Sequence, residues 1–241
     1  MAVLHLPATS ATLAELAYFG GEVLHPSAMR PCMENKIAIL VRNILNPAFA
    51  GTVISSDDEP LVIGGNGVTA GTTPSGFDKA PRKSAVKMVT TIESIASVNI
   101  KAGSWKSVAA VGKRAMQALE DAGVKVVLIT QASSSHSLTV AIDEAAAAAA
   151  VAALEEAFEL EMIRGDISGI NVTGGLSALS IVGPMRGVVG TLAKLTNGFA
   201  SVQSNVFAVA QGSSERSITA LVARDSLATS IKAVHHAFLE Q

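Results

Sequence analysis

A short polar motif occurs twice in this chain of 241 residues, and each copy carries side chains that could bind a small polar ligand. Residues 131–137 read QASSSHS and residues 211–217 read QGSSERS, eighty positions apart. Gln131 and Gln211 each end an apolar run, and a glutamine amide both donates and accepts hydrogen bonds. Such an amide can recognise a hydroxyl group or the ammonium and carboxylate groups of an amino acid.

The residues alone leave two interpretations of the doubled motif open. A helix predicted to start near residue 106 or 187 offers free backbone N–H groups and a positive dipole end, which favour a carboxylate. Together with the glutamine amide, that helix start would form an amino-acid pocket. A duplicated hairpin with a polar turn and no ligand fits equally well, because small polar turns are common.

The glycine-rich stretch VIGGNGVTAGTT, residues 62–73, does not fit a nucleotide-binding loop. A P-loop needs a lysine after its last glycine, and none is near. The dinucleotide fingerprint needs a glycine spacing that Gly65, Gly67 and Gly71 miss by one residue. A flexible linker is therefore the favoured interpretation.

The other polar residues predict no catalytic or metal site. The histidines at 5, 25, 136, 235 and 236 lack the spacing of metal ligands. The sequence contains no nucleophile elbow and no constellation of paired carboxylates. We therefore expect no catalytic residue, no metal and no cofactor, which favours a binding function over a complete enzyme.

The motif belongs to a longer repeat that predicts two copies of one supersecondary unit. Residues 126–142 align with 206–222, and residues 102–111 align with 182–191 at the same offset without a gap. Each copy reads as strand, helix, strand, strand and helix. The first copy is predicted to have strands over 97–101, 124–130 and 136–142, a helix over 106–121 and a long helix from 143. The second is predicted to have strands over 177–183, 205–210 and 216–222 and helices over 187–200 and 224–239.

One more strand would complete a ferredoxin-like βαββαβ unit. The segment AVKMVTTIE, residues 85–93, precedes the first copy and is otherwise unpaired, so we expect it to join the sheet of the second copy. The predicted domains are residues 1–56, a Gly- and Pro-rich linker over 57–84, a first unit over 94–165, and a second unit formed by 85–93 plus 174–241.

Composition indicates a globular protein with 49% hydrophobic and 16% charged residues. A net charge of −2 and only 4% aromatic residues argue against nucleic acid as a partner. The single Cys32 excludes an intrachain disulfide and fits a reducing compartment. The alanine-rich run at 145–154 is too short to span a membrane, and the N-terminus does not read as a secretory signal. We expect a cytoplasmic protein, with the plastid stroma as the alternative.

The sequence resembles one known family over nearly its whole length. AYFGGEVLHPSAMRP (17–31) and ILVRNILNPAFAGTVIS (39–55) look like the last segment of the aspartate kinase catalytic domain. LITQASSSHSLTVAI and AVAQGSSERSITALV look like the two ACT-domain signatures of that family. The resemblance implies an α+β fold with tandem ferredoxin-like ACT domains, preceded by a remnant of an α/β amino-acid-kinase domain over residues 1–56. It also implies that ACT domains pair side by side, so a homodimer is expected.

Within this family, the glutamine version of the motif is similar to the threonine-sensitive branch, particularly the bifunctional aspartate kinase–homoserine dehydrogenases. The resemblance implies that Gln131 and Gln211 contact threonine and that the Gly183–Gly187 turn holds its carboxylate. The effector-binding residues expected on this basis are Gln211, Gly183, Met185, Arg186, Gly187, Gln131, Ser133 and Ser213.

The chain also departs from the family. The Lys-Phe-Gly-Gly strand and the aspartate- and phosphate-binding part of the kinase domain have no counterpart in it, and Glu22 stands where many members have lysine. In the first copy, Ser104, Ser107 and Ala110 replace the usual glycines, and Trp105 adds bulk. The second copy keeps GPMRGVVG, so we expect it to hold the stronger site.

The sequence thus predicts an allosteric region of an aspartate kinase that binds L-threonine, or alternatively L-lysine, and has no kinase activity by itself. ATP and magnesium would be needed only in a complete kinase. One alternative is a split or truncated aspartate kinase, which phosphorylates L-aspartate with ATP and needs a catalytic partner chain. The other is an ACT dimerisation module without a ligand. Neither nucleic acid nor a membrane is an expected partner.

Overall fold

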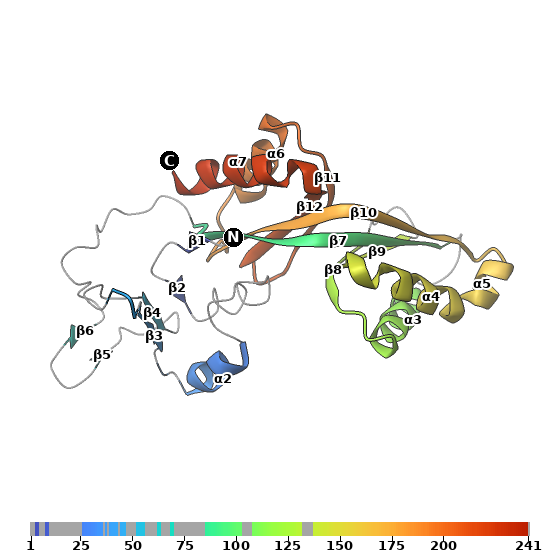
Figure 1. Ribbon diagram of the computed structural model, residues 1–241, viewed down its shortest axis with the longest axis horizontal. Coiled ribbons are helices and arrows are strands. Elements are labelled where there is room, and N and C mark those ends of the chain that lie inside the picture. The colour runs from blue at the N-terminus through green and yellow to red at the C-terminus, as the bar shows by residue number, and fades with distance from the viewer. Residues whose placement is uncertain are drawn as a thin grey trace.

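Two long antiparallel strands run through the middle of the protein in the computed structural model (Figure 1). They are β7 (Met88–Ala102) and β10 (Ile167–Val182). Helices lie on opposite sides of this strand pair, so that one group is at the top of Figure 1 and the other at the bottom. The structure describes residues 3–4, 8–9, 26–35, 37, 39–42, 44–46, 52–55, 62–63, 68–69, 85–102, 108–131 and 137–240.

The remaining elements between residues 85 and 240 follow the predicted repeat. The first copy adds α3 (Val108–Asp121), β8 (Val126–Gln131), β9 (Ser137–Asp143), the 3-10 turn η1 (Glu144–Ala146), α4 (Ala147–Ala157) and α5 (Glu159–Ile163). The second copy adds α6 (Thr191–Ser201), β11 (Val206–Gln211), β12 (Ser217–Ala223), the 3-10 turn η2 (Arg224–Ser226) and α7 (Leu227–Leu239).

The order of the main sheet shows how the two units share their strands. The order is β11-β12-β10-β7-β9-β8, and every neighbouring pair is antiparallel. The N-terminal half of β7 pairs with the C-terminal half of β10, with Met88 opposite Val182, and completes the second unit. The predicted pairing of residues 85–93 with the second copy is therefore confirmed, as is the α+β fold of tandem βαββαβ units.

The exchange of strands is reciprocal, which the sequence did not predict. Residues 167–173, at the start of β10, pair with the C-terminal half of β7 and complete the first unit. The strand that was expected to start at residue 177 therefore starts at Ile167. Each unit has the same sheet order, because β10-β7-β9-β8 in the first corresponds to β7-β10-β12-β11 in the second.

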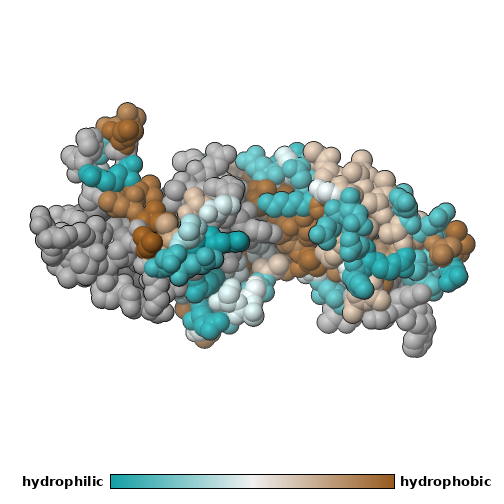
Figure 2. Space-filling model, turned by 90° about the horizontal axis from the view of Figure 1, so that it is seen from below, coloured by the Kyte–Doolittle hydropathy of each residue, from teal (hydrophilic) through white to brown (hydrophobic). Residues whose placement is uncertain are grey.

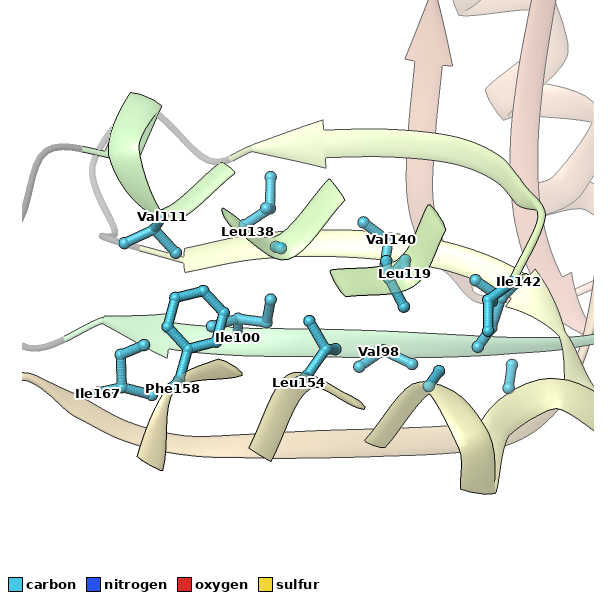
Figure 3. Packing of buried hydrophobic residues seen from close by; sticks show 14 residues of the cluster. Val98, Ile100, Val111, Leu119, Leu138, Val140, Ile142, Leu154, Phe158 and Ile167 are labelled. Carbon is cyan, nitrogen blue, oxygen red and sulfur yellow. The ribbon is translucent and has the colours of Figure 1, made fainter. Parts of the chain in front are cut away.

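Each unit has its own hydrophobic core between its half of the sheet and its two main helices. In the first unit, alternate residues of the strands point toward the helices, as period-two alternation requires. Val98 and Val140 of the sheet belong to the same core cluster as Leu154 of α4 and Phe158 at the end of α4. All four residues are almost fully buried (Figure 3). The second core is built in the same way. It includes Leu179, Ile181, Leu195, Phe199, Val222, Val234 and Phe238.

The second helix of the first unit is shorter than predicted. The long helix expected from residue 143 divides into η1, α4 and α5, because Phe158 leaves the helical conformation (φ −114°) and turns its ring into the core. Asp143 caps the start, where its Oδ1 accepts the Ala145 N–H at 2.9 Å. Hydrophobic atoms gather at the end of the molecule where α5 exposes Leu160 and Ile163 (Figure 2).

The repeat is not free of gaps, which corrects the sequence alignment. Val140 and Ala220 are eighty residues apart, but their strand partners Val98 and Leu179 are eighty-one apart. The first copy therefore has one additional residue between its first strand and its first helix. The helix that was expected to start near residue 187 starts at Thr191, and residues 183–190 form a turn.

The N-terminal part contains short elements. The strands β2 (Ala8–Thr9), β4 (Thr52–Ser55) and β3 (Ile39–Val41) form a three-stranded sheet, and β1 (Val3–Leu4) pairs with β7. The others are α2 (Pro26–Glu34), β5 (Val62–Ile63) and β6 (Val68–Thr69). The assignment of residues 1–56 to a kinase-domain remnant stays a prediction. Among the described residues, no helix is both long enough and apolar enough to cross a membrane.

Candidate functional site

The expected binding residues of the second unit lie in two adjoining loops at one end of its sheet. The turn 183–190 follows β10, and the loop 212–216 joins β11 to β12. Because β10 and β12 are neighbouring strands, with Val182 opposite Ser217, the two loops meet. The Gly183 N–H donates to the Arg216 carbonyl oxygen at 2.9 Å. The structure thus brings Gln211, at the end of β11, to the same end of the sheet as the turn.

Gly183 is required by the strand that the second unit receives from before the first copy. A Cβ at this position would lie 2.2 Å from the Ala85 carbonyl oxygen, a distance that no side chain tolerates. The backbone is held there because the Lys87 N–H donates to the Val182 carbonyl oxygen at 2.8 Å. The role of Gly183 in the structure is therefore close packing of backbone against backbone.

Gly187 presents an amide to a carboxylate. Its N–H donates to Oε2 of Glu215 at 2.8 Å, and the two residues lie on the two different loops. Both have positive φ angles, 72° for Gly187 and 51° for Glu215. Glycine adopts this conformation without cost, whereas glutamate adopts it only when its surroundings hold it there. The turn therefore binds a carboxylate of its own chain.

Glu215 is a residue of this site that sequence reasoning missed. The signal was a difference between the copies, because the first copy has serines at 107 and 135 where the second has Gly187 and Glu215, each eighty positions later. A serine cannot supply a carboxylate to the turn. The pair of changes, taken together, would have indicated that residues 187 and 215 are in contact.

The other expected residues differ in how they could take part. Met185 is only 3% exposed and its side chain belongs to the core of the second unit, so it has no surface to offer a ligand. Its backbone is also engaged, because its N–H donates to the Gly183 carbonyl oxygen and its own carbonyl oxygen accepts the Val188 N–H. Arg186, Gln211 and Ser213 are exposed.

In the first unit, the structure describes fewer of the predicted site residues. Gln131 ends β8 opposite Leu138 and is exposed, which matches the place of Gln211 in β11. Ser133 lies outside the described residues, as do residues 103–107, which correspond in sequence to the turn before α6.

The groups on the second turn and loop suit binding better than chemistry. An amide N–H, a glutamine amide, a serine hydroxyl and an arginine can all form hydrogen bonds with a small zwitterion. In the part of the chain that the structure describes, no three His, Cys, Asp or Glu side chains gather as they would around a metal ion.

Comparisons with known proteins give the family. The sequence profile of the ACT domain matches residues 98–158 and 179–238. The chloroplastic bifunctional aspartokinase/homoserine dehydrogenase of Daucus carota is 33% identical over 225 residues, which cover 93% of this chain and 23% of that protein. This chain therefore spans about a quarter of the length of the curated relatives it matches.

Solved structures agree with the fold. The aspartate kinase of Clostridium acetobutylicum superposes with a TM-score of 0.75 and 19% identity, covering 96% of this chain and 48% of that one. The ligand-free regulatory subunit of aspartate kinase from Thermus thermophilus gives a TM-score of 0.53 and 23% identity, covering 64% of this chain and 99% of that one. The two profile matches fall on the two units that share β7 and β10. The chain therefore belongs to the ACT-domain family, and it is similar to part of the aspartate kinases named above.

Proposed function

We propose that this ACT region binds L-threonine as a feedback effector, chiefly in its second unit, and so regulates an aspartate kinase of amino-acid biosynthesis. The observation that supports the proposal most is the bond between the Gly187 amide and the Glu215 carboxylate. It identifies an amide on the turn that is directed to a carboxylate, at the end of the sheet where Gln211 lies. The relatives named as bifunctional aspartokinase/homoserine dehydrogenases support the same branch of the family.

In the proposed complex, the threonine carboxylate replaces that of Glu215 on the Gly187 amide. The Gln211 side chain then forms hydrogen bonds with the hydroxyl or the ammonium group of the ligand, since it can both donate and accept. Met185 contributes through the core beneath the turn and not by contact with threonine, because its side chain is buried.

Regulation requires that threonine bind one conformation of the kinase better than another. Ordering the loop 212–216 and the turn 183–190 around a ligand changes the surface at that end of the second unit. The outermost strands β8 and β11 offer edges for association, so we also propose a homodimer formed through the ACT units. A loop change next to such an interface would reach the partner and, through it, the catalytic part.

The test is calorimetric titration of the purified chain with L-threonine, with L-lysine and ATP as controls. Saturable heat from threonine, with an affinity that Gln211→Ala clearly weakens, would support both the effector and its place. Heat from lysine alone would indicate that the effector is lysine, as in the lysine-sensitive branch of the family. Absence of heat from all three would contradict the effector proposal and leave a dimerisation module.

A second candidate is a regulatory chain that acts with a separate catalytic chain. The Thermus thermophilus neighbour is named a regulatory subunit, and the match covers 99% of it. In this case, a catalytic partner would co-purify with the chain from its natural source and would confer ATP binding on the complex. Threonine binding by the isolated chain would remain compatible with either arrangement.

A further inference from the structure

The two long strands pass from one unit to the other in the middle, where their regular pairing breaks. The register of β7 and β10 shifts between Thr173 and Leu176 and again before Ala178. Gly175 on β10 and Ser94 on β7 have positive φ angles of 68° and 58° at this point. A bulge of this kind bends the strand and leaves a backbone group without a ladder partner. This crossover connects the two ACT units.

Glu144 of the first unit supplies the missing partner. Its Oε1 accepts the Gly175 N–H at 2.7 Å, and its Oε2 pairs with a guanidinium nitrogen of Arg224 in the second unit. Gly174 makes room for this approach, because a Cβ there would lie 2.5 Å from Oε1. The Gly175 amide, and next the Arg224 guanidinium, hold the pKa of Glu144 below its usual value. One carboxylate thus contacts the crossover and both units.

Glu144 and Arg224 occupy the same position in the two copies, eighty residues apart, as the first residues of η1 and η2. Two copies of one repeat, facing each other, bring identical positions together. Like charges there would repel, and this chain has opposite charges instead. The contact is therefore specific to the pairing of the first unit with the second.

Among the described residues, an apolar cluster that spans the two halves of the sheet also joins the two units. Two of the six buried residues of this cluster are alanine, and four partly buried residues pack against it, namely Ile92, Val127, Ala208 and Ala210. Its buried members are Ile95, Leu128, Ala141, Leu176, Ala178 and Leu221. The ion pair alone would contribute little, because the two side chains are 34% and 41% exposed. The charge-assisted bond to Gly175 is the stronger part, since it satisfies an amide that the bulge frees.

We propose that Glu144, held between the Gly175 amide and Arg224, is a clamp that fixes the angle between the two ACT units. When the clamp opens, β10 is free to rotate about Gly175, and the second unit turns relative to the first. The clamp acts whatever the effector is, so it can be tested without a ligand. It also gives one unit a defined hinge through which to affect the other.

The test measures the distance between the units directly. Spin labels on Glu155→Cys in α4 and Lys232→Cys in α7, two exposed positions, are introduced into the full chain with Cys32→Ser. Pulsed electron paramagnetic resonance should give a narrow distance distribution, which broadens or shifts in Glu144→Ala and to a smaller extent in Arg224→Gln. Glu156→Ala, which replaces an exposed glutamate in α4, is the matched control and should change nothing.

Amide hydrogen exchange at Gly175 provides the second readout. It should become about tenfold faster or more in Glu144→Ala, because the amide loses its acceptor. Glu144→Gln keeps an acceptor oxygen and should lie between the two. If Glu144→Ala fails to fold, the distance distributions of Glu144→Gln and Arg224→Gln decide the matter. Unchanged distributions in folded clamp variants would overturn the proposal.

Discussion

The two ACT units have the same sheet order, but their sequences differ in the segment that leads into the first helix. In the second unit, this segment is a turn with Gly187 bound to Glu215. In the first, the corresponding sequence segment is one residue longer, and serines stand at both matching positions. Each unit nevertheless ends its edge strand with an exposed glutamine. Because the glutamine is common to both units and the turn is not, our proposal for the second unit rests on the glutamine and the turn together.

A second comparison shows what the two units keep in common. Arg114 of α3 lies 4.9 Å from the ring centroid of Phe158, and Lys194 of α6 lies 5.1 Å from that of Phe238. The cations and the rings are both eighty residues apart. A cation over an aromatic ring joins the two helices of each unit. Features present in both copies therefore support the shared fold, and the features that differ mark the candidate site.

The largest expected effect tests that shared part. Phe158→Ala and Phe238→Ala should each lower the free energy of unfolding by about 3–5 kcal/mol, because each removes a ring buried to more than nine-tenths from a unit's core. Urea denaturation followed by circular dichroism measures both. A loss below about 1 kcal/mol in either variant would contradict the view that the two positions are equivalent core sites.

The next largest effect tests which of the two units binds threonine. Gln211→Ala should weaken threonine binding roughly tenfold to a hundredfold, the usual effect of removing a hydrogen bond to a charged group. Gln131→Ala is the matched variant, and we expect it to change the affinity much less. Calorimetry with both variants gives the result. Equal losses would mean that both units bind, and a larger loss in Gln131→Ala would reverse the assignment.

A smaller effect concerns the turn itself. Gly187→Ser imports the residue that the first copy has and should destabilise the chain by about 1 kcal/mol, because residue 187 has φ 72°. The same variant should bind threonine more weakly, since the strained turn presents its amide less well. Glu215→Ser imports the other residue without changing the backbone at 187. If both variants bound threonine as the parent does, the turn would have no part in the site.

The smallest effect is the pH dependence of the clamp between the units. The pKa of Glu144 is lowered in the folded state, so its stabilising contribution is complete above the ordinary glutamate pKa of about 4.3. That contribution is lost as the pH falls through the lower folded-state value. The stability difference between the parent and Glu144→Gln should therefore be constant near neutral pH and shrink below about pH 4. A difference that did not change with pH would argue against a charged Glu144 in the clamp.

The sequence predicted most of the fold because the repeat was visible and its strands alternate regularly. The strand at 85–93 was correctly given to the second unit, since it had no other partner. The start of β10 was missed because ISGINVTG contains three polar residues and two glycines and does not look like a strand. It forms one only because β7 provides a partner of matching length.

The candidate site was harder to predict for a physical reason. Its contacts join loops from different parts of the chain, such as Gly187 with Glu215, and no local pattern reports them. Met185 was expected to contact the effector from its place in the turn, yet its side chain turns into the core. The helix start was placed four residues early because the turn 187–190 is apolar and reads as a helix.

The most direct test of the central claim follows the Gly187 amide by nuclear magnetic resonance while threonine is added. The account predicts a saturable shift of the Gly187 N–H signal, which follows the same affinity as the calorimetric titration and needs a correspondingly higher threonine concentration in Gln211→Ala. The Gln131 signals should change little over the same range. Threonine binding that leaves the Gly187 signal in place would contradict the account, because the effector would then occupy a site other than the second turn.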